Sequence, residues 1–150
     1  MNQEIFLIGL NHKTAGVDIR ERFALSDCDP VSTGLVKDAG AVTETMILST
    51  CNRVEFLVVG DGGQNIRSRI LRFWADQCGQ PQADLEDHTY CHVGDKAVDH
   101  LFTVASSLDS MILGEPQILG QLKTAYRKAV ENGAAKVIVN RLLHKAFSVA

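Results

Sequence analysis

Several features that mark other protein classes are missing from these 150 residues. No apolar run approaches the roughly 18 residues of a membrane helix, and the N-terminus MNQEIFLIGL has no basic leader or small-residue cleavage site. None of the cysteines forms a C-x-x-C pair, which argues against a zinc ribbon or a redox dithiol; they are Cys28, Cys51, Cys78 and Cys91. We therefore expect a cytoplasmic protein with reduced thiols and no membrane partner.

Charge excess, sequence repeats and a dinucleotide motif are also missing. The net charge is −3, from 15 basic and 18 acidic residues, which argues against a nucleic-acid surface over most of the chain. A local contact with a phosphate or a carboxylate is still allowed. No G-x-G-x-x-G follows a predicted strand. The content of 45% hydrophobic and 22% charged residues is typical of one ordinary globular domain.

The order of apolar segments predicts the fold of residues 1–93. Short apolar runs predict strands at 4–10, 43–49, 54–59 and 88–93. Helices are expected after a capping box of Asp18 and Glu21, from Pro30, and over 66–78 with Gly79 as the stop; residues 80–87 are expected to form a loop. This βαββαβ order predicts an α+β fold, a ferredoxin-like antiparallel sheet with helices on one face.

Residues 94–150 are predicted to form a second, helical part that follows the sheet. Asp95 is expected to cap its first helix, and Pro116 to open the longest one. Asn132-Gly133 ends that helix, and a last helical pattern runs to residue 150 without a stop signal. We therefore expect the chain to be part of a longer polypeptide.

A small polar segment, STCNR at 49–53, lies between the two predicted middle strands in ILSTCNRVEFLVV. A nearby cation makes a thiol nucleophilic by lowering its pKa, and Arg53 is two residues from Cys51. The guanidinium can also bind a carboxylate with two hydrogen bonds, and Thr50 and Asn52 can orient a carbonyl oxygen. On spacing alone, a buried structural cysteine beside a surface arginine explains these residues equally well.

Two other parts of the sequence carry candidate functional groups. In ILGEPQILGQ, Gln117 and Gln121 share a face near a helix start, where an anionic or carbonyl ligand can bind. A solvated polar helix face is the alternative. His100, on the helix after Asp95, can transfer protons for a thiol or can simply pack at the core boundary. His12 is its rival.

The cluster of His88, Cys91 and His92 does not match a familiar zinc pattern, and no metal site is expected.

Four segments of this chain, in order, resemble the N-terminal catalytic region of the glutamyl-tRNA reductase family. They are GLNHKTAGVDIRERFAL, ILSTCNRVEF, HLFTVASSLDSMILGEPQILGQLKTAYRKA and NRLLHKAF. The resemblance implies NADPH-dependent reduction of glutamyl-tRNA to glutamate-1-semialdehyde in tetrapyrrole and haem biosynthesis. It implies that the Cys51 thiolate attacks the aminoacyl ester and forms a glutamyl thioester, which accepts hydride more readily than an ester does.

The same resemblance assigns roles by position. Cys51 and His100 are implied as catalytic residues, and Arg53 as the group that holds the glutamate carboxylate. The implied substrate-binding set is Thr50, Asn52, Arg53, Ser110, Glu115, Pro116, Gln117 and Gln121, and the secondary candidates, from the opening H-K-T motif, are His12 and Lys13. The chain departs from the family pattern at Ser107, usually Gly, and at Gly16, usually Pro; neither departure touches the TCNR tetrad.

Cofactor and partners are implied in the same way. NADPH would be bound by a domain missing from this chain, and a homodimer would form through a C-terminal domain that is also missing. The helix at 137–150 would begin the linking spinal helix, and no cofactor site is expected within the fragment. The implied partners are glutamyl-tRNA and the glutamate-1-semialdehyde aminotransferase. The competing interpretation is a non-catalytic module that binds a small acid or a protein and has a structural cysteine.

Overall fold

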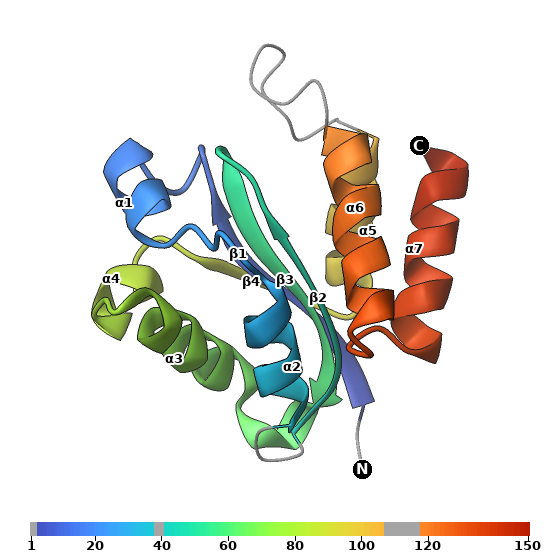
Figure 1. Cartoon of the computed structure of the whole chain (residues 1–150), viewed down its shortest axis with the longest axis horizontal. Coiled ribbons are helices and arrows are strands. Elements are labelled where there is room, and N and C mark those ends of the chain that lie inside the picture. The colour runs from blue at the N-terminus through green and yellow to red at the C-terminus, as the bar shows by residue number, and fades with distance from the viewer. Residues whose placement is uncertain (1–2, 38–40, 107–117) are drawn as a thin grey trace.

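A four-stranded antiparallel sheet with helices on both faces forms the centre of the molecule (Figure 1). The computed structural model describes residues 3–37, 41–106 and 118–150. Within these ranges the chain is α+β, and its elements follow the order β1-α1-α2-β2-β3-α3-α4-β4-α5-α6-α7, with one short 3-10 turn after β3. Among these same residues, no helix is both long enough and apolar enough to cross a bilayer.

The strands are β1 (Gln3–Asn11), β2 (Val42–Ser49), β3 (Arg53–Asp61) and β4 (Tyr90–Val93). They lie in the order β2-β3-β1-β4, and every neighbouring pair is antiparallel. The two central strands are buried over most of their length, because helices cover both faces of the sheet. That double burial explains why their sequences are nearly continuous apolar runs instead of alternating ones.

The first group of helices packs on one face of the sheet. It comprises α1 (Val17–Arg22), α2 (Asp29–Lys37), α3 (Ile66–Cys78) and α4 (Gln82–Glu86). Trp74 of α3 is fully buried at the centre of this core, against the ring of Phe56. Its indole N–H donates to the carbonyl oxygen of Phe23 at 2.8 Å, which satisfies the polar atom of an otherwise apolar ring.

The second group covers the opposite face and comprises α5 (Asp95–Ala105), α6 (Ile118–Glu131) and α7 (Val137–Val149). Leu57 and Val59 of β3 belong to the core on this side, together with Leu101 of α5. The predicted helical part therefore lies against the sheet as a third layer.

Glu44 of β2 fixes the start of α7. Its carboxylate accepts hydrogen bonds from the backbone N–H groups of Lys136, Ile138 and Val139 at 2.8, 3.2 and 2.9 Å. The helix has no side-chain cap of its own at Lys136. The sheet thus supplies the anion that a helix N-terminus favours.

Most predicted elements are present, and three local predictions are wrong. Asp18 and Glu21 form no capping box, because α1 begins at Val17 with Gly16 as its N-cap and without a side-chain hydrogen bond. Asp95 is the first residue of α5 and not its cap, which is Gly94. The expected loop at 80–87 contains α4 (Gln82–Glu86), whose Leu85 is drawn into the first core.

Other boundaries agree with the sequence. Helix α3 spans 66–78, and Gly79 ends it with a φ of +63°, a conformation that glycine adopts without strain. Gly133 follows α6 with a φ of +80°. In the described ranges α6, at 14 residues, is the longest helix, and the expected start at Pro116 lies outside those ranges.

Candidate active site

The TCNR tetrad forms a tight turn between β2 and β3. The backbone N–H of Thr50 donates to the carbonyl oxygen of Arg53 at 2.8 Å. The Thr50 hydroxyl oxygen accepts from the backbone N–H groups of Asn52 and Arg53 at 3.1 and 3.2 Å. This hydroxyl, predicted to orient a carbonyl oxygen, therefore has a structural task in closing the turn.

Cys51 lies at the tip of this turn with an exposed thiol, and Arg53 beneath it is fully buried. The structural alternative, a buried cysteine beside a surface arginine, predicted the opposite arrangement and is wrong. The other three cysteines are free and partly buried. Burial raises the pKa of the Cys28 thiol to about 11 and also raises the pKa values of Cys78 and Cys91.

The loop that carries His12 and Lys13 lies beside the TCNR turn. Asn11, the last residue of β1, is paired in the sheet with Arg53, the first residue of β3. The Asn11 side chain is buried, and its amide oxygen accepts the backbone N–H of Lys13 at 2.9 Å. The structure therefore places the predicted H-K-T and TCNR segments at one edge of the sheet.

A buried ionic network extends from Arg53 across the sheet. The Arg53 guanidinium Nη1 lies 3.4 Å from Glu55 Oε1, and Glu55 is only 4% exposed. Glu55 Oε2 accepts hydrogen bonds from the Tyr90 hydroxyl and from His100 Nε2, each at 2.5 Å. Glu55 thus connects the predicted carboxylate-binding arginine with the predicted catalytic histidine.

Gly9, in the neighbouring strand, leaves space for the Glu55 side chain to reach His100. Gly9 of β1 is paired with Glu55 on one side and with Tyr90 on the other. A Cβ atom at Gly9 would lie 2.9 Å from Glu55 Cγ and 2.4 Å from the Val54 carbonyl oxygen. The Glu55 side chain therefore occupies space that any other residue at Gly9 would fill.

The charge of Glu55 is set by two opposing effects. Burial alone would raise the pKa of its carboxyl group. The His100 hydrogen bond and the charges of His100 and Arg53, aided by the Tyr90 hydrogen bond, outweigh burial and lower the pKa below the ordinary value of 4.5. Glu55 is therefore ionised at neutral pH and acts as an acceptor only, so His100 Nε2 carries the proton that it donates.

Two neighbouring rings pack against the His100 ring. The rings of Tyr90 and His92, from β4, lie 5.2 and 4.9 Å from the His100 ring, centroid to centroid. The His100 side chain is 13% exposed, so the site is not sealed from solvent. His92 belongs to this ring cluster, while His88 Nδ1 lies 2.8 Å from the Asp84 carbonyl oxygen. Across the described ranges, no group of three or more potential ligands is placed to hold a metal ion.

Sequence reasoning missed Glu55 and Gly9. The available signal was an acidic residue inside an apolar run, in RVEFLVV, two positions after Arg53 and therefore on the same face of the strand. A charge inside a buried strand needs a partner. The glycine in the neighbouring strand, in FLIGLN, was a second signal, because a missing side chain leaves room for the side chain of the acidic residue.

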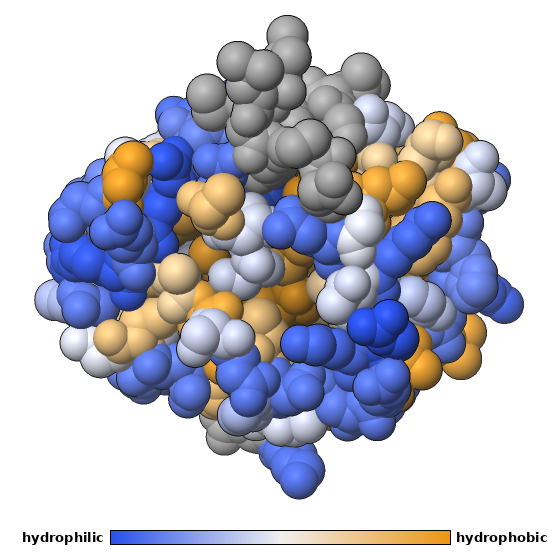
Figure 2. All heavy atoms as spheres, turned by 45° about the horizontal axis from the view of Figure 1, so that its top comes forward, coloured by the Kyte–Doolittle hydropathy of each residue, from blue (hydrophilic) through white to orange (hydrophobic). Residues whose placement is uncertain are grey.

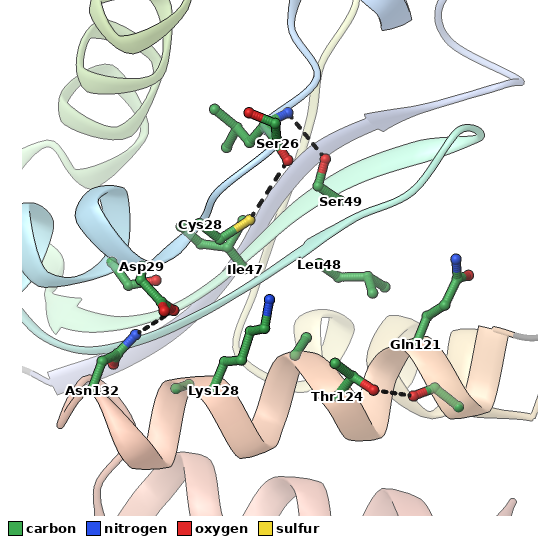
Figure 3. Close-up of a pocket in the computed structure, with 15 residues that line it drawn as sticks. Ser26, Cys28, Asp29, Ile47, Leu48, Ser49, Gln121, Thr124, Lys128 and Asn132 are labelled. Atoms are coloured by element: carbon green, nitrogen blue, oxygen red, sulfur yellow. Dashed lines mark hydrogen bonds between the residues drawn. The ribbon is translucent and has the colours of Figure 1, made fainter.

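The remaining predicted site residues lie in or near α6. Gln121 is exposed on the first turns of α6 and lines a pocket between α2, α6 and β2 (Figure 3). Ser110, Glu115, Pro116 and Gln117 lie outside the described residues, as does Ser107. Gly16 has a φ of −71°, which is the value that proline imposes, so this departure from the family pattern requires no change of φ.

Comparisons with known proteins show the family of this chain. Residues 8–150 match the family described as "Glutamyl-tRNAGlu reductase, N-terminal domain". The chain therefore belongs to the family of glutamyl-tRNA reductase N-terminal domains.

The chain is 61% identical, over its whole length, to the glutamyl-tRNA reductase of Nitratidesulfovibrio vulgaris (strain DP4), of which it covers 34%. It is 59% identical to that of Solidesulfovibrio magneticus and covers 33% of it. The solved structure of glutamyl-tRNA reductase from Methanopyrus kandleri superposes with a TM-score of 0.74 at 30% identity. That match covers 96% of this chain and 32% of the solved one, so the chain spans about a third of its relatives.

Proposed function

We propose that this chain is the substrate-binding and nucleophilic domain of a glutamyl-tRNA reductase. The observation that carries the proposal is the exposed thiol of Cys51 on a closed turn, directly beside a buried Arg53–Glu55–His100 network. Family membership supports the substrate, because the relatives are named for glutamyl-tRNA. The proposed catalytic residues are Cys51 and His100.

The reaction assigned to these residues is transfer of the glutamyl group to Cys51. The thiolate attacks the carbonyl carbon of the aminoacyl ester and a C–S bond forms. The bond from that carbon to the ribose oxygen then breaks, and the tRNA leaves as an alcohol that takes up one proton. A glutamyl thioester on Cys51 is the product of this step.

We assign the remaining roles from position and charge. Arg53 binds the γ-carboxylate of the substrate, and Glu55 holds the guanidinium through Nη1. His100, whose Nε2–H is held by Glu55, is proposed to take or give protons through its other ring nitrogen. Thr50 and Asn52 shape the turn, and His12 and Lys13 lie at the same edge of the sheet. Gln121, with Ser110, Glu115, Pro116 and Gln117, completes the proposed substrate-binding set.

We propose no NADPH site within these residues. The sequence has no G-x-G-x-x-G after a strand, which is the motif that brings a helix N-terminus to the pyrophosphate. We therefore assign reduction of the thioester to glutamate-1-semialdehyde to a part of the protein outside these residues. Dimerisation and contact with the aminotransferase stay predictions for that larger protein. We also assign the sheet to the ferredoxin-like class, which its β2-β3-β1-β4 order supports.

Glutamyl-tRNA labelled on the glutamate tests the proposal. The protein, its Cys51→Ser variant and a matched Cys78→Ser variant are mixed with the substrate and quenched with acid. We expect label on the protein, or released glutamate, with the unchanged chain and with Cys78→Ser, and neither with Cys51→Ser. Equal label or release in all three proteins would show that Cys51 is not the nucleophile. A folded protein that neither binds label nor releases glutamate would favour a non-catalytic binding module.

A further inference from the structure

A pocket of about 340 Å³ lies next to the candidate active site, between α2, α6 and the edge strand β2 (Figure 3). This volume is in the range of small-ligand sites. Apolar side chains of Leu25, Ile47, Leu48 and Ala125 line part of it. The space-filling view shows the surface hollowed between the two groups of helices, with hydrophobic residues at the floor (Figure 2).

The pocket reaches the turn that carries the thiol. Ser49, the last residue of β2, lines the pocket and is two residues from Cys51. Because the chain turns at Thr50, the Cα atoms of these two residues are separated by at most roughly 7 Å, the span of two residues in an extended chain. The Ser49 hydroxyl accepts the backbone N–H of Leu25 at 3.1 Å and so fixes one wall of the pocket to the end of β2.

The pocket and the ionic network lie side by side. Leu48, which lines the pocket, is paired across the ladder with Glu55, and paired residues project from the same face of a sheet. The charged network lies on this face of β3, β1 and β4, and the pocket lies along the edge strand β2, because both Ile47 and Leu48 line it. Along the chain, Cys51 lies between the two: Ser49 of the pocket is two residues before it, and Arg53 of the network is two residues after it.

We propose that this pocket binds the terminal nucleoside of the aminoacyl-tRNA, a proposal that rests on the function proposed above. An aminoacyl ester carries two groups on opposite sides of the carbon that the thiolate attacks. The glutamyl side chain bears a carboxylate and belongs on the side of Arg53. The leaving ribose and its base therefore extend to the other side, where the pocket lies.

The lining suits a nucleobase. Apolar walls from Ile47, Leu48 and Ala125 face the flat surfaces of the base. At the far end, the Asp29 carboxylate is held by the Asn132 amide at 3.0 Å, and Lys128 extends from α6 toward β2 (Figure 3). A carboxylate acceptor and an ammonium donor match the amino group and ring nitrogens on the edge of adenine.

The test compares two esters of glutamate. One is glutamyl-adenosine, esterified at the ribose, and the other is the α-methyl ester, which has no nucleoside. The rate at which each acylates Cys51 is measured by mass spectrometry. We compare the unchanged chain with Ala125→Leu, which fills the pocket, and with Lys128→Ala, a change at an exposed residue that leaves the core intact. Lys123→Ala, on the same helix but outside the lining, is the matched control.

We expect Ala125→Leu to lower the ratio of the adenosyl rate to the methyl rate by about tenfold, because the added carbons displace the base. Lys128→Ala lowers the same ratio by about threefold, the effect of one lost hydrogen bond in a solvated site. Lys123→Ala leaves it unchanged. A ratio that stays constant in both pocket variants would overturn the proposal.

The outcome separates this inference from the function on which it rests. If neither ester acylates the unchanged chain, the function proposed for Cys51 fails. Binding of adenosine alone, followed by the chemical shifts of the backbone amides, then tests whether the pocket binds the nucleoside. Shifts confined to residues around the pocket and lost in Ala125→Leu would support it, and an absence of such shifts would overturn it.

Discussion

Gly9 leaves the space through which Glu55 crosses strand β1 to reach His100. The pairing of Gly9 with Glu55 on β3 and with Tyr90 on β4 puts the glycine between the carboxylate and its partners. A Gly9→Ala substitution would bring a Cβ atom within 2.4 Å of the Val54 carbonyl oxygen. We expect it to destabilise the protein by about 1–3 kcal/mol and to slow acylation of Cys51. Gly16→Ala is the control, since nothing lies within 4 Å of its Cβ position; equal thermal stability of the two variants would contradict the expectation.

Glu55→Gln tests the charge of the network. The folded-state pKa of Glu55 is lowered, so its ionic contribution to stability is complete above the ordinary pKa of 4.5 and is lost as pH falls through the lowered value. We expect the variant to be about 2 kcal/mol less stable at neutral pH, with the difference shrinking in acid. Urea unfolding across that pH range measures it. A difference independent of pH would show that shape, and not charge, makes the contribution.

Glu44→Ala should destabilise helix α7. The substitution removes three hydrogen bonds to backbone N–H groups at the helix start and leaves those groups without their acceptor. We expect a loss of about 2–3 kcal/mol in the free energy of unfolding. Glu131→Ala is the control, because that exposed side chain forms an ion pair with Arg127 at 3.8 Å and such exposed pairs contribute little. Hydrogen exchange should show faster opening of α7 in Glu44→Ala alone.

The four thiols should differ in their reaction with iodoacetamide. Cys51 is exposed, while burial raises the pKa values of Cys28, Cys78 and Cys91. Because the thiolate is the reactive form, we expect Cys51 to be alkylated first near neutral pH. Peptide mass spectrometry after brief labelling measures the order. Labelling of any of the other three at the same rate as Cys51 would contradict it.

Gly16→Pro should stabilise the protein. The φ of −71° already matches proline, and the residue caps α1, where proline costs no helical hydrogen bond. We expect a gain of about 0.4–1 kcal/mol from the lower entropy of the unfolded chain. Thermal unfolding measures the change, and Gly16→Ala separates the effect of the ring from that of a simple side chain. A loss of stability would mean that the loop from Asn11 does not tolerate the ring.

Local signals in the sequence were sufficient for much of the fold. Gly79 and Gly133 stop their helices with positive φ, as their positions after apolar stripes predicted. The strand runs were correct to within two residues. In the two central strands, β1 and β3, burial along most of the strand makes the sequence largely apolar. The capping box at Asp18 was wrong because the helix begins at Val17, two residues earlier than a cap at Asp18 predicts. Helix α4 was missed because it is held by tertiary burial of Leu85 and has only a weak pattern of its own.

Part of the candidate site was also predicted from the sequence, and part of it was missed. The family resemblance pointed to Cys51, Arg53 and His100, and the structure brings the last two together through a residue that no motif named. Glu55 could not be assigned from spacing, since its partners Tyr90 and His100 lie 35 and 45 positions away in the sequence. The same holds for the pocket beside β2, whose walls come from α2 and α6.

The turn from Thr50 to Arg53 has a kinetic consequence. Three hydrogen bonds close this turn before any substrate arrives. The backbone that carries the thiol is therefore already ordered, and little conformational entropy would be lost as the ester carbonyl of the proposed substrate approaches. Under the proposed function, a nucleophile on such a rigid hairpin would let the binding energy of a large substrate be used to align the ester, because the thiol is already in position.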